Sequence, residues 1–369
     1  MTFVCLLALL SVTAGSQAAK APAEPMPMRG FCIAAPHPED LDKFIMFIER
    51  ELAPRHVNTL VLRVEYDYQF ESHPELRDGD PLTKADVKKL VAVCRKDGIK
   101  IIPLVDFLGH QSYHASVGEL LKQYPEFDET PWIKLPQDYV KNPTEVYCKS
   151  YCTLHPKVHE VIFAVMDELC DVFEADTFHA GMDEVFFLGE DKCPRCAGHD
   201  KAELFADEVR RIHDHLQEHK RHLWIWGDRL LDGKMTGLGK WEGSCKDTAR
   251  AIDLIPKDIL ICDWHYNQPV PTAAYFAVKG FNVVTCPYKN GPSAAQQAYD
   301  MTKWRATALA PMKDRFQGVV QTVWCSANAF LEKDYAGKGE PANAWNCFVT
   351  LSDEIKKLET PPPAPVVKP

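Results

Sequence analysis

Residues 158–185 read VHEVIFAVMDELCDVFEADTFHAGMDEV, and this stretch contains the repeating unit of the fold. Apolar residues recur at helical period through 158–173, as on a helix that buries one face. The run 176–182 is short and apolar, which is typical of a buried strand. Two adjacent acids, Asp183 and Glu184, follow it directly. The stretch therefore predicts a helix that leads into a buried strand, with carboxylates at the carboxyl end of that strand.

The same unit is repeated along the chain. A second striped helix is expected over 39–52, and seven further strand-like runs alternate with helical patterns. They are GFCIAA (30–35), VNTLVLRV (57–64), IKIIPLV (99–105), HLWIW (222–226), DILICDW (258–264), FNVVTC (281–286) and GVVQTVW (318–324). Parallel strands that are buried on both faces read as continuous apolar runs. Eight such β–α repeats predict a closed (β/α)8 TIM barrel, an α/β fold, over residues 29–358.

Composition and the chain ends limit the partners and the location. A net charge of −10 offers no basic field for nucleic acid or anionic lipid, so neither is expected as a partner. Residues 1–18 hold a short apolar run followed by small residues, which predicts a signal peptide and a secreted or periplasmic protein. A disordered start is the alternative. The run is too short for membrane insertion. A Pro-rich leader (19–28) and a disordered Pro-rich tail (359–369) are expected to flank the barrel.

Four cysteines stand outside the apolar runs, namely Cys148, Cys152, Cys193 and Cys196. Their spacing suits a disulfide, a tetrathiolate zinc site or free thiols. In an exported protein the favoured interpretation is a structural disulfide.

Polar and aromatic residues collect where the predicted strands end. They are Glu65, Asp67, Asp106, His110, Asp183, Glu184, Trp226, Asp228, Asp263, Trp264, Tyr266, Tyr288, Asn290 and Trp324. Individually, such an Asp often caps a helix and such a Trp often packs in the core. In a barrel, however, the strand ends form one mouth, where the reacting groups lie. Acids among indoles suit a sugar, and the long connection 109–155 is expected to wall the site.

The directions of the Asp183 and Glu184 side chains depend on where the strand before them ends. Period two places His179, Gly181 and Asp183 on one face of the strand, so Glu184 would point away if the strand continued. We predict that the strand ends here and that both acids reach the mouth. Glycoside hydrolysis uses two carboxyl groups with different protonation states. The alternative is a pair of solvated acids that open a helix.

The motif HAGMDEV closely resembles the His-x-Gly-Gly-Asp-Glu signature of glycoside hydrolase family 20, the β-N-acetylhexosaminidases, with Met182 in place of the second glycine. The resemblance also includes residues 152–185, IIPLVDFLGH (101–110) and RGFCIAA (29–35), and it covers 29–330. That family usually carries a small α/β domain before its barrel, for which we expect no counterpart here.

The resemblance implies a mechanism and a set of site residues. Glu184 would be the general acid and base. Asp183 would orient the substrate's own 2-acetamido group, whose carbonyl oxygen attacks the anomeric carbon and forms an oxazolinium intermediate. No cofactor and no metal ion would take part. The substrate-binding set would be Tyr288 on the acetamide carbonyl, Trp226, Trp264 and Trp324 around the sugar, Asp67 and His110 as a polar pair behind the acid, and also His179 and Asn290.

Three positions depart from the family pattern. His37 stands where the family's strand-one arginine grips sugar hydroxyls, Ser326 replaces an acid and Asn290 replaces an aspartate. Arg63 is either a substitute for the lost arginine or part of an ion pair inside the barrel. The sequence thus predicts a secreted, exo-acting β-N-acetylhexosaminidase for glycans that end in GlcNAc or GalNAc. The alternatives are an inactive carbohydrate-binding barrel, or a glycosidase for another sugar that pairs two carboxylates through Asp67 or Asp263.

Overall fold

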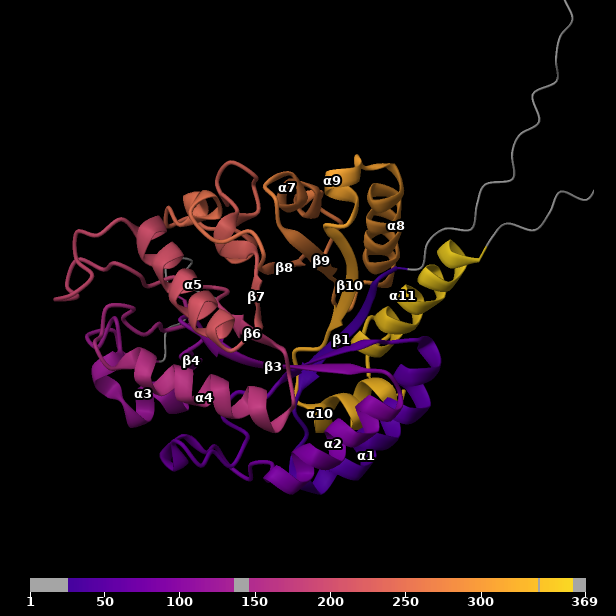
Figure 1. The fold of residues 1–369 in the computed structure, drawn as a ribbon, viewed down its shortest axis with the longest axis horizontal. Helices are drawn as coiled ribbons and strands as arrows, with labels where there is room; N and C mark the ends of the chain where they lie inside the picture. Colours follow the sequence, from indigo (N-terminus) through magenta and orange to yellow (C-terminus); the bar gives the residue numbers. More distant parts are fainter. Residues whose placement is uncertain (1–25, 136–145, 338, 361–369) are drawn as a thin grey trace, which may run out of the picture.

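The computed structural model describes residues 26–135, 146–337 and 339–360. The predicted signal peptide, most of the Pro-rich leader and nearly all of the predicted tail lie outside these ranges. Eight parallel strands close into a barrel in the order β1-β10-β9-β8-β7-β6-β3-β2, which confirms the predicted (β/α)8 fold (Figure 1). The barrel strands are β1 (Met28–Ala34), β2 (Thr59–Arg63), β3 (Lys100–Phe107), β6 (Thr177–Gly181), β7 (His222–Trp226), β8 (Leu260–Trp264), β9 (Asn282–Cys286) and β10 (Phe316–Thr322).

Helices pack around the outside of the barrel, and a two-stranded hairpin, β4 (Ser112–Tyr113) with β5 (Ser116–Val117), follows β3 (Figure 1). None of the helices in the described ranges is long and apolar enough to cross a membrane. The helices are α1 (Leu41–Phe47), α2 (Lys84–Lys96), α3 (Glu119–Gln123), α4 (Val158–Val172), α5 (Lys201–Glu218), α6 (Gly239–Glu242), α7 (Thr272–Val278), α8 (Gly291–Thr307), α9 (Ala310–Lys313), α10 (Ala327–Ala329) and α11 (Ala344–Glu359).

Two segments differ from the predicted repeat. The helix expected over 39–52 is regular only in α1, and it continues as a π-helical turn, Ile48–Leu52, and a 3-10 turn, Ala53–Arg55. Pro54 has no N–H to donate, so a regular helix cannot run through it. Between β7 and β8 the chain forms short helical turns instead of one long helix.

The barrel strands bury both faces, which explains why the strand runs are continuously apolar. In β8, Leu260, Cys262 and Trp264 point into the barrel and pack in its interior cluster. Ile261, between them, packs instead in the larger cluster under the surrounding helices. Because neighbouring strands have the same alternation, the barrel is filled with side chains and its polar site is confined to one end.

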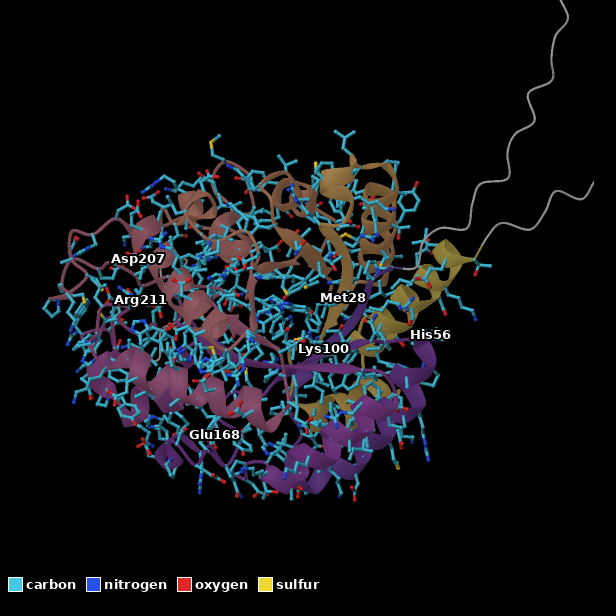
Figure 2. The ribbon with its side chains drawn as sticks, viewed as in Figure 1. Met28, His56, Lys100, Glu168, Asp207 and Arg211 are labelled. Carbon is cyan, nitrogen blue, oxygen red and sulfur yellow. The ribbon has the colours of Figure 1, made fainter. Side chains whose placement is uncertain are left out.

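Polar contacts fix the connections against the helices. Glu168 on α4, labelled in Figure 2, accepts hydrogen bonds from the backbone N–H groups of Glu71 at 2.7 Å and Ser72 at 2.9 Å. This helix-borne carboxylate therefore holds the loop that follows β2, next to the carboxyl ends of the strands.

Candidate active site

A cavity of about 460 Å³ opens at the carboxyl ends of the barrel strands. Its lining combines strand-end residues with residues of the long connection after β3, which walls the site as expected. The lining residues are Arg63, Asp106, His110, Tyr113, Tyr147, Asp183, Glu184, Trp264, Tyr266 and Trp324. A hollow of similar volume, about 480 Å³, lies at the opposite end beside α11. Its Arg29–Glu359 ion pair joins β1 to α11, so we assign that hollow a structural role.

The end of β6 is a turn that aims both paired acids into the cavity. Gly181, Met182 and Glu184 have φ values of 64°, 70° and 48°, in the left-handed region, so the two-residue alternation of the strand stops. A Cβ on Gly181 would lie 2.6 Å from the Cα of Asp106, so only glycine fits there. Strand β6 therefore ends just before Asp183 and Glu184, as predicted.

His110 links the two acids. Its Nε2 lies 3.2 Å from Oδ2 of Asp183 and 3.4 Å from Oε2 of Glu184, so the two carboxylates lie side by side. Burial opposes a charge on His110, but its contacts with Cys148 and Asp183 outweigh burial and hold the pKa of His110 well above its usual range. The site therefore contains an imidazolium against the paired acids.

The environments of the two acids separate their pKa values. Burial alone would raise the pKa of Asp183, but the charge and hydrogen bond of His110 outweigh it and lower that pKa. Burial raises the pKa of Glu184, and the hydrogen bond from Tyr147 only partly offsets it. The pKa of Asp183 is thus lowered and that of Glu184 raised, which is the direction of separation that acid catalysis beside a fixed negative charge requires.

Two donors from the long connection contact one oxygen of Glu184. The Tyr147 hydroxyl donates to Oε2, and the Cys148 thiol lies 3.5 Å from the same oxygen. Cys148 also lies 3.6 Å from Nδ1 of His110. These contacts leave Oε1 of Glu184 as the oxygen that would carry the proton of the acid.

Asp228, at the end of β7, positions the acid from behind. Its Oδ2 accepts a hydrogen bond from the backbone N–H of Glu184 at 3.0 Å, and its Oδ1 accepts one from the indole of Trp264 at 3.3 Å. The guanidinium of Arg229, fully buried, contacts Asp228 at 2.5 Å and balances its charge. The Asp228 carboxylate thus fixes both the turn that carries Glu184 and the indole of Trp264 in the aromatic wall.

A third acid on the cavity wall, Asp106, lies beside another buried acid, Glu65. Burial, together with the charges of Glu65 and Asp183, raises its pKa well above the usual range. Glu65 has a raised pKa from burial, and it accepts a hydrogen bond from the backbone N–H of Asp106 at 3.0 Å. Both carboxyl groups therefore keep a proton to higher pH than a solvated carboxyl group does.

Aromatic side chains form the remaining wall. Trp264 and Tyr266 stack with ring centroids 5.1 Å apart, and the guanidinium of Arg63 lies 5.0 Å from the ring centroid of Trp324. Burial, with the nearby charges of Asp183 and Glu184, raises the pKa of Tyr266 well above its usual range. The Tyr266 hydroxyl therefore stays protonated and remains a hydrogen-bond donor beside the acids.

The structure brings five of the ten predicted site residues to the cavity: Asp183, Glu184, His110, Trp264 and Trp324. Trp226 and His179 lie deeper, inside the barrel, with ring centroids 4.4 Å apart and at most 1% exposure. His179 lies in the middle of β6, and Trp226, the last residue of β7, packs its indole against His179 and Trp324. They support the floor of the cavity and do not line it.

The other three predicted residues also lie outside the cavity lining. Tyr288 packs its ring 5.4 Å from that of Tyr266, and the Asn290 side chain caps α8 by accepting from the backbone N–H of Ser293 at 3.1 Å. Asp67, whose pKa burial raises to about 6, has Asp78, His37 and Arg63 as its charged neighbours. The predicted pairing of Asp67 with His110 is therefore replaced by the contacts of His110 with the acid pair.

Sequence reasoning missed Tyr147 entirely and gave no role to Tyr266. Tyr266 does follow a predicted strand end, so its position was a usable signal, whereas Tyr147 lies far from any strand. The structure contains no disulfide of the favoured kind among the residues it describes, since the twelve cysteines from Cys32 to Cys347 are free thiols in it. Cys148 faces His110 and Glu184 instead of the other loop cysteines, because the backbone of the loop turns it into the cavity wall.

A closed barrel whose mouth holds one acid of raised pKa, a neighbouring acid of lowered pKa and an aromatic wall defines a glycoside hydrolase barrel. The family model described as glycosyl hydrolase family 20, catalytic domain, matches residues 61–359. The chain belongs to glycoside hydrolase family 20.

Relatives and solved structures agree with this assignment. A β-hexosaminidase of Akkermansia muciniphila is 35% identical over 124 residues, 32% of this chain and 23% of that protein. One of Vibrio furnissii is 26% identical over 62% of this chain and 32% of its own length. The chain thus spans about a third or less of these relatives.

Two solved structures share the fold. The β-N-acetylhexosaminidase of Bacteroides fragilis matches with a TM-score of 0.61 at 15% identity, over 89% of this chain and 66% of that one. The exo-β-N-acetylglucosaminidase of Vibrio harveyi matches with a TM-score of 0.60 at 16% identity, over 90% of this chain and 58% of that one.

Proposed function

We propose that this protein is an exported β-N-acetylhexosaminidase that removes terminal β-linked GlcNAc or GalNAc by substrate-assisted, retaining hydrolysis. The observation that carries the proposal is that Asp183 and Glu184 contact one imidazole nitrogen from the same side of the cavity. A conventional retaining pair faces the sugar from two sides, with carboxyl groups about 5 Å apart.

Glu184 is placed to act on the leaving group. Burial raises its pKa, which favours the protonated form that a general acid needs, and its Oε2 already accepts from Tyr147. Oε1 therefore delivers the proton to the glycosidic oxygen. The same oxygen then takes a proton from the water that opens the intermediate, so Glu184 acts first as an acid and then as a base.

Asp183 is placed to act on the acetamido group. Its Oδ2 is held by His110, whereas its Oδ1 is buried and has no hydrogen-bond partner among the described residues. A buried carboxylate oxygen without a partner is costly, and an amide N–H from the substrate would satisfy it. The negative charge also stabilises the positive oxazolinium that forms when the acetamide oxygen attacks the anomeric carbon.

Other carboxylates are poor candidates for an enzyme nucleophile. Asp106 lines the cavity, but burial raises its pKa well above the usual range, which disfavours the ionised form that a nucleophile needs, and Asp67 does not line the cavity. Asp263 is buried, with its oxygens 2.8 Å from the Thr272 hydroxyl and 3.2 Å from His265. These placements favour attack by the substrate's own amide over a two-carboxylate route through Asp67 or Asp263.

The cavity walls suit a single terminal sugar. Trp264 and Trp324 offer ring faces to an acetamide methyl and to the sugar plane, and the Tyr266 hydroxyl is a donor for the acetamide carbonyl in place of Tyr288. Arg63 lines the same cavity. We therefore assign to it the binding of sugar hydroxyls, in place of the family's strand-one arginine, whose position His37 occupies here. Export rests on the apolar run of residues 1–18.

The test is a panel of 4-nitrophenyl β-glycosides with the full chain, comparing 2-acetamido sugars (GlcNAc, GalNAc) with 2-hydroxy sugars (glucose, galactose). We expect release from the 2-acetamido sugars alone and its loss in Glu184→Gln. The matched control is Glu218→Gln on the surface end of α5, which should keep full activity. Cleavage of only the 2-hydroxy sugars would contradict the mechanism. Glycan binding without turnover, unchanged in Glu184→Gln, would show a binding barrel.

A further inference from the structure

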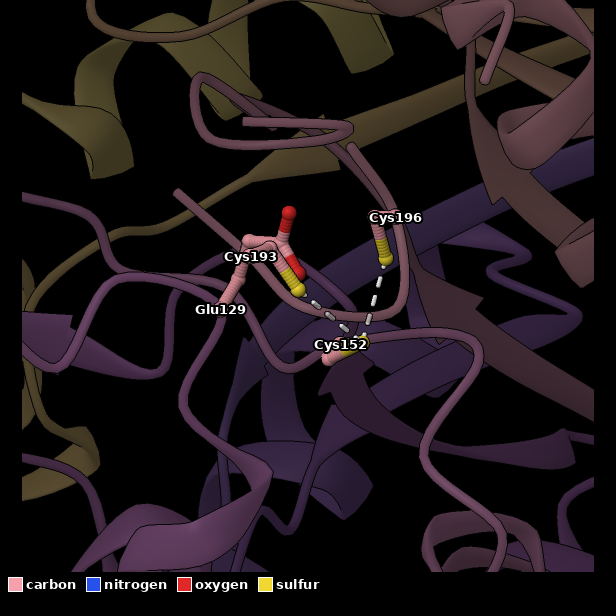
Figure 3. A group of neighbouring side chains, drawn as sticks. All are labelled: Glu129, Cys152, Cys193 and Cys196. Atoms are coloured by element: carbon pink, nitrogen blue, oxygen red, sulfur yellow. Dashed lines mark hydrogen bonds between the residues drawn. The ribbon is translucent and has the colours of Figure 1, made fainter. Parts of the chain in front are cut away.

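A second group of reactive side chains lies apart from the cavity lining. Glu129, Cys152, Cys193 and Cys196, here named the thiol cluster, converge from two loops (Figure 3). The sulfur of Cys152 lies 3.1 Å from that of Cys196 and 3.6 Å from that of Cys193. One ligand atom from each of the four residues lies within 4.8 Å of all the others. Each residue is at most 2% exposed.

Two of the thiols come from one tight turn, Cys193-Pro194-Arg195-Cys196. The backbone N–H of Cys193 donates to the carbonyl of Glu190 at 2.8 Å, and that of Ala197 donates to the carbonyl of Cys193 at 3.1 Å. The backbone N–H groups of Arg195 and Cys196 are also directed at the sulfur of Cys193. The turn therefore presents both sulfurs to the same side.

Glu129 supplies the fourth ligand atom. One of its carboxylate oxygens, Oε1, accepts from the backbone N–H of Glu190 at 3.0 Å. The other, Oε2, is buried and has no hydrogen-bond partner among the described residues. A fully buried carboxylate among three thiols is costly without a positive charge beside it, and Glu129 forms no ion pair with a lysine or arginine in the described part of the chain.

We propose that the thiol cluster binds one structural Zn²⁺ through the three cysteine sulfurs and Glu129. Zinc takes four tetrahedral ligands, and zinc–sulfur bonds of about 2.3 Å place neighbouring sulfurs about 3.8 Å apart. The sulfur separations of 3.1 and 3.6 Å are close to that edge length, so binding requires only small side-chain shifts. The donor set of thiolates with one carboxylate is within the range that zinc accepts.

A disulfide would leave part of the thiol cluster without a partner. A bond between Cys152 and Cys196 would leave Cys193 unpaired and Glu129 buried without a counter-charge. Zinc uses all four ligand atoms and neutralises part of their charge.

The ion would join the two loops that build the active site. Cys152 follows Tyr147 and Cys148 in the long connection after β3, and Cys193 follows Glu184 in the loop after β6. A shared ion therefore holds the Tyr147 hydroxyl in reach of Glu184. Hydrolysis itself requires no metal, so the zinc site is independent of the reaction proposed above.

The first test is the metal content of the full chain, purified without chelating resin and measured by inductively coupled plasma mass spectrometry. We expect about one zinc ion per chain. Thiol titration in denaturant with a chelator should then find every cysteine reduced, and the intact mass should show no loss of two hydrogens. A zinc-free chain with a Cys152 disulfide, or a chain that takes up no added Zn²⁺, would overturn the proposal.

The second test uses variants with a matched control. Cys196→Ser and Glu129→Gln should lower the zinc content, Cys196→Ser to near zero, and should lower Tm. The control Cys245→Ser changes a half-exposed cysteine outside the cluster and should leave one ion bound. If Cys196→Ser fails to fold, the metal content and thiol count of the unaltered chain still decide. Zinc content that is unchanged in both variants would contradict the assigned ligands.

Discussion

Tyr147→Phe tests how the acid is tuned. The Tyr147 hydroxyl donates to Oε2 of Glu184 and stabilises the ionised carboxylate, which lowers the pKa of Glu184. A hydrogen bond to a charged group is worth about 1.5–3 kcal/mol, and one pKa unit corresponds to about 1.4 kcal/mol. Cys148 and His110 still contact the same oxygen in the variant, so we take the lower end of that range. The pKa of Glu184 should rise by about 1 unit.

The assay is the pH profile of kcat/KM on an aryl 2-acetamido glycoside. The alkaline limb reports loss of the general acid's proton, so it should move to higher pH by about 1 unit in Tyr147→Phe. The ring should stay in place, since Tyr147 stacks on Trp241 at a centroid distance of 5.6 Å. The control Tyr113→Phe alters a hydroxyl at the rim, 62% exposed, and should leave the limb unmoved. A limb that stays fixed in Tyr147→Phe, or moves to lower pH, would refute this reasoning.

Three further changes follow from the same geometry. Asp183→Asn should lower kcat at least about a hundredfold, because it removes the charge that faces the developing cation; it should also lower Tm, because it breaks the buried contact with His110. Equal kcat values would contradict that role. Gly181→Ala should destabilise the chain by more than about 2 kcal/mol in thermal or urea unfolding, since the new Cβ meets Asp106 at a φ of 64°. Burial lowers the pKa of His265 but Asp263 outweighs it and raises the pKa to about 9. The folded-state pKa of His265 lies above its unfolded value, so the free energy of unfolding should fall by about 2–3 kcal/mol between pH 6.5 and 9. If a His265→Gln chain shows the same fall, His265 is not its cause.

The fold could be predicted from sequence because burial on both faces leaves a clear record. Each barrel strand, such as β8, carries apolar residues at successive positions, and the alternation with helices then leaves few topologies. Helix lengths were harder to predict, since Pro54 and the short turns after β7 interrupt the repeat locally.

The site residues could be predicted from the sequence only where they stand at the end of a recognisable strand. Trp264 and His110 reach the cavity from strand ends, as expected. Asn290 instead uses its side chain to cap a helix, an alternative that residue type does not distinguish. Tyr147 enters from a loop that is distant in sequence, so nothing in the periodicity indicates that it contacts Glu184.

The measurement that tests the central claim most directly varies the nucleophile within the substrate. Aryl β-glucosaminides carrying acetyl, monofluoroacetyl, difluoroacetyl and trifluoroacetyl groups on the 2-nitrogen differ in the electron density of the amide oxygen. If that oxygen attacks the anomeric carbon while Asp183 holds the N–H, kcat/KM should fall steeply with each added fluorine. A rate that does not depend on the number of fluorines, together with a trapped covalent glycosyl-enzyme, would show that the protein supplies the nucleophile.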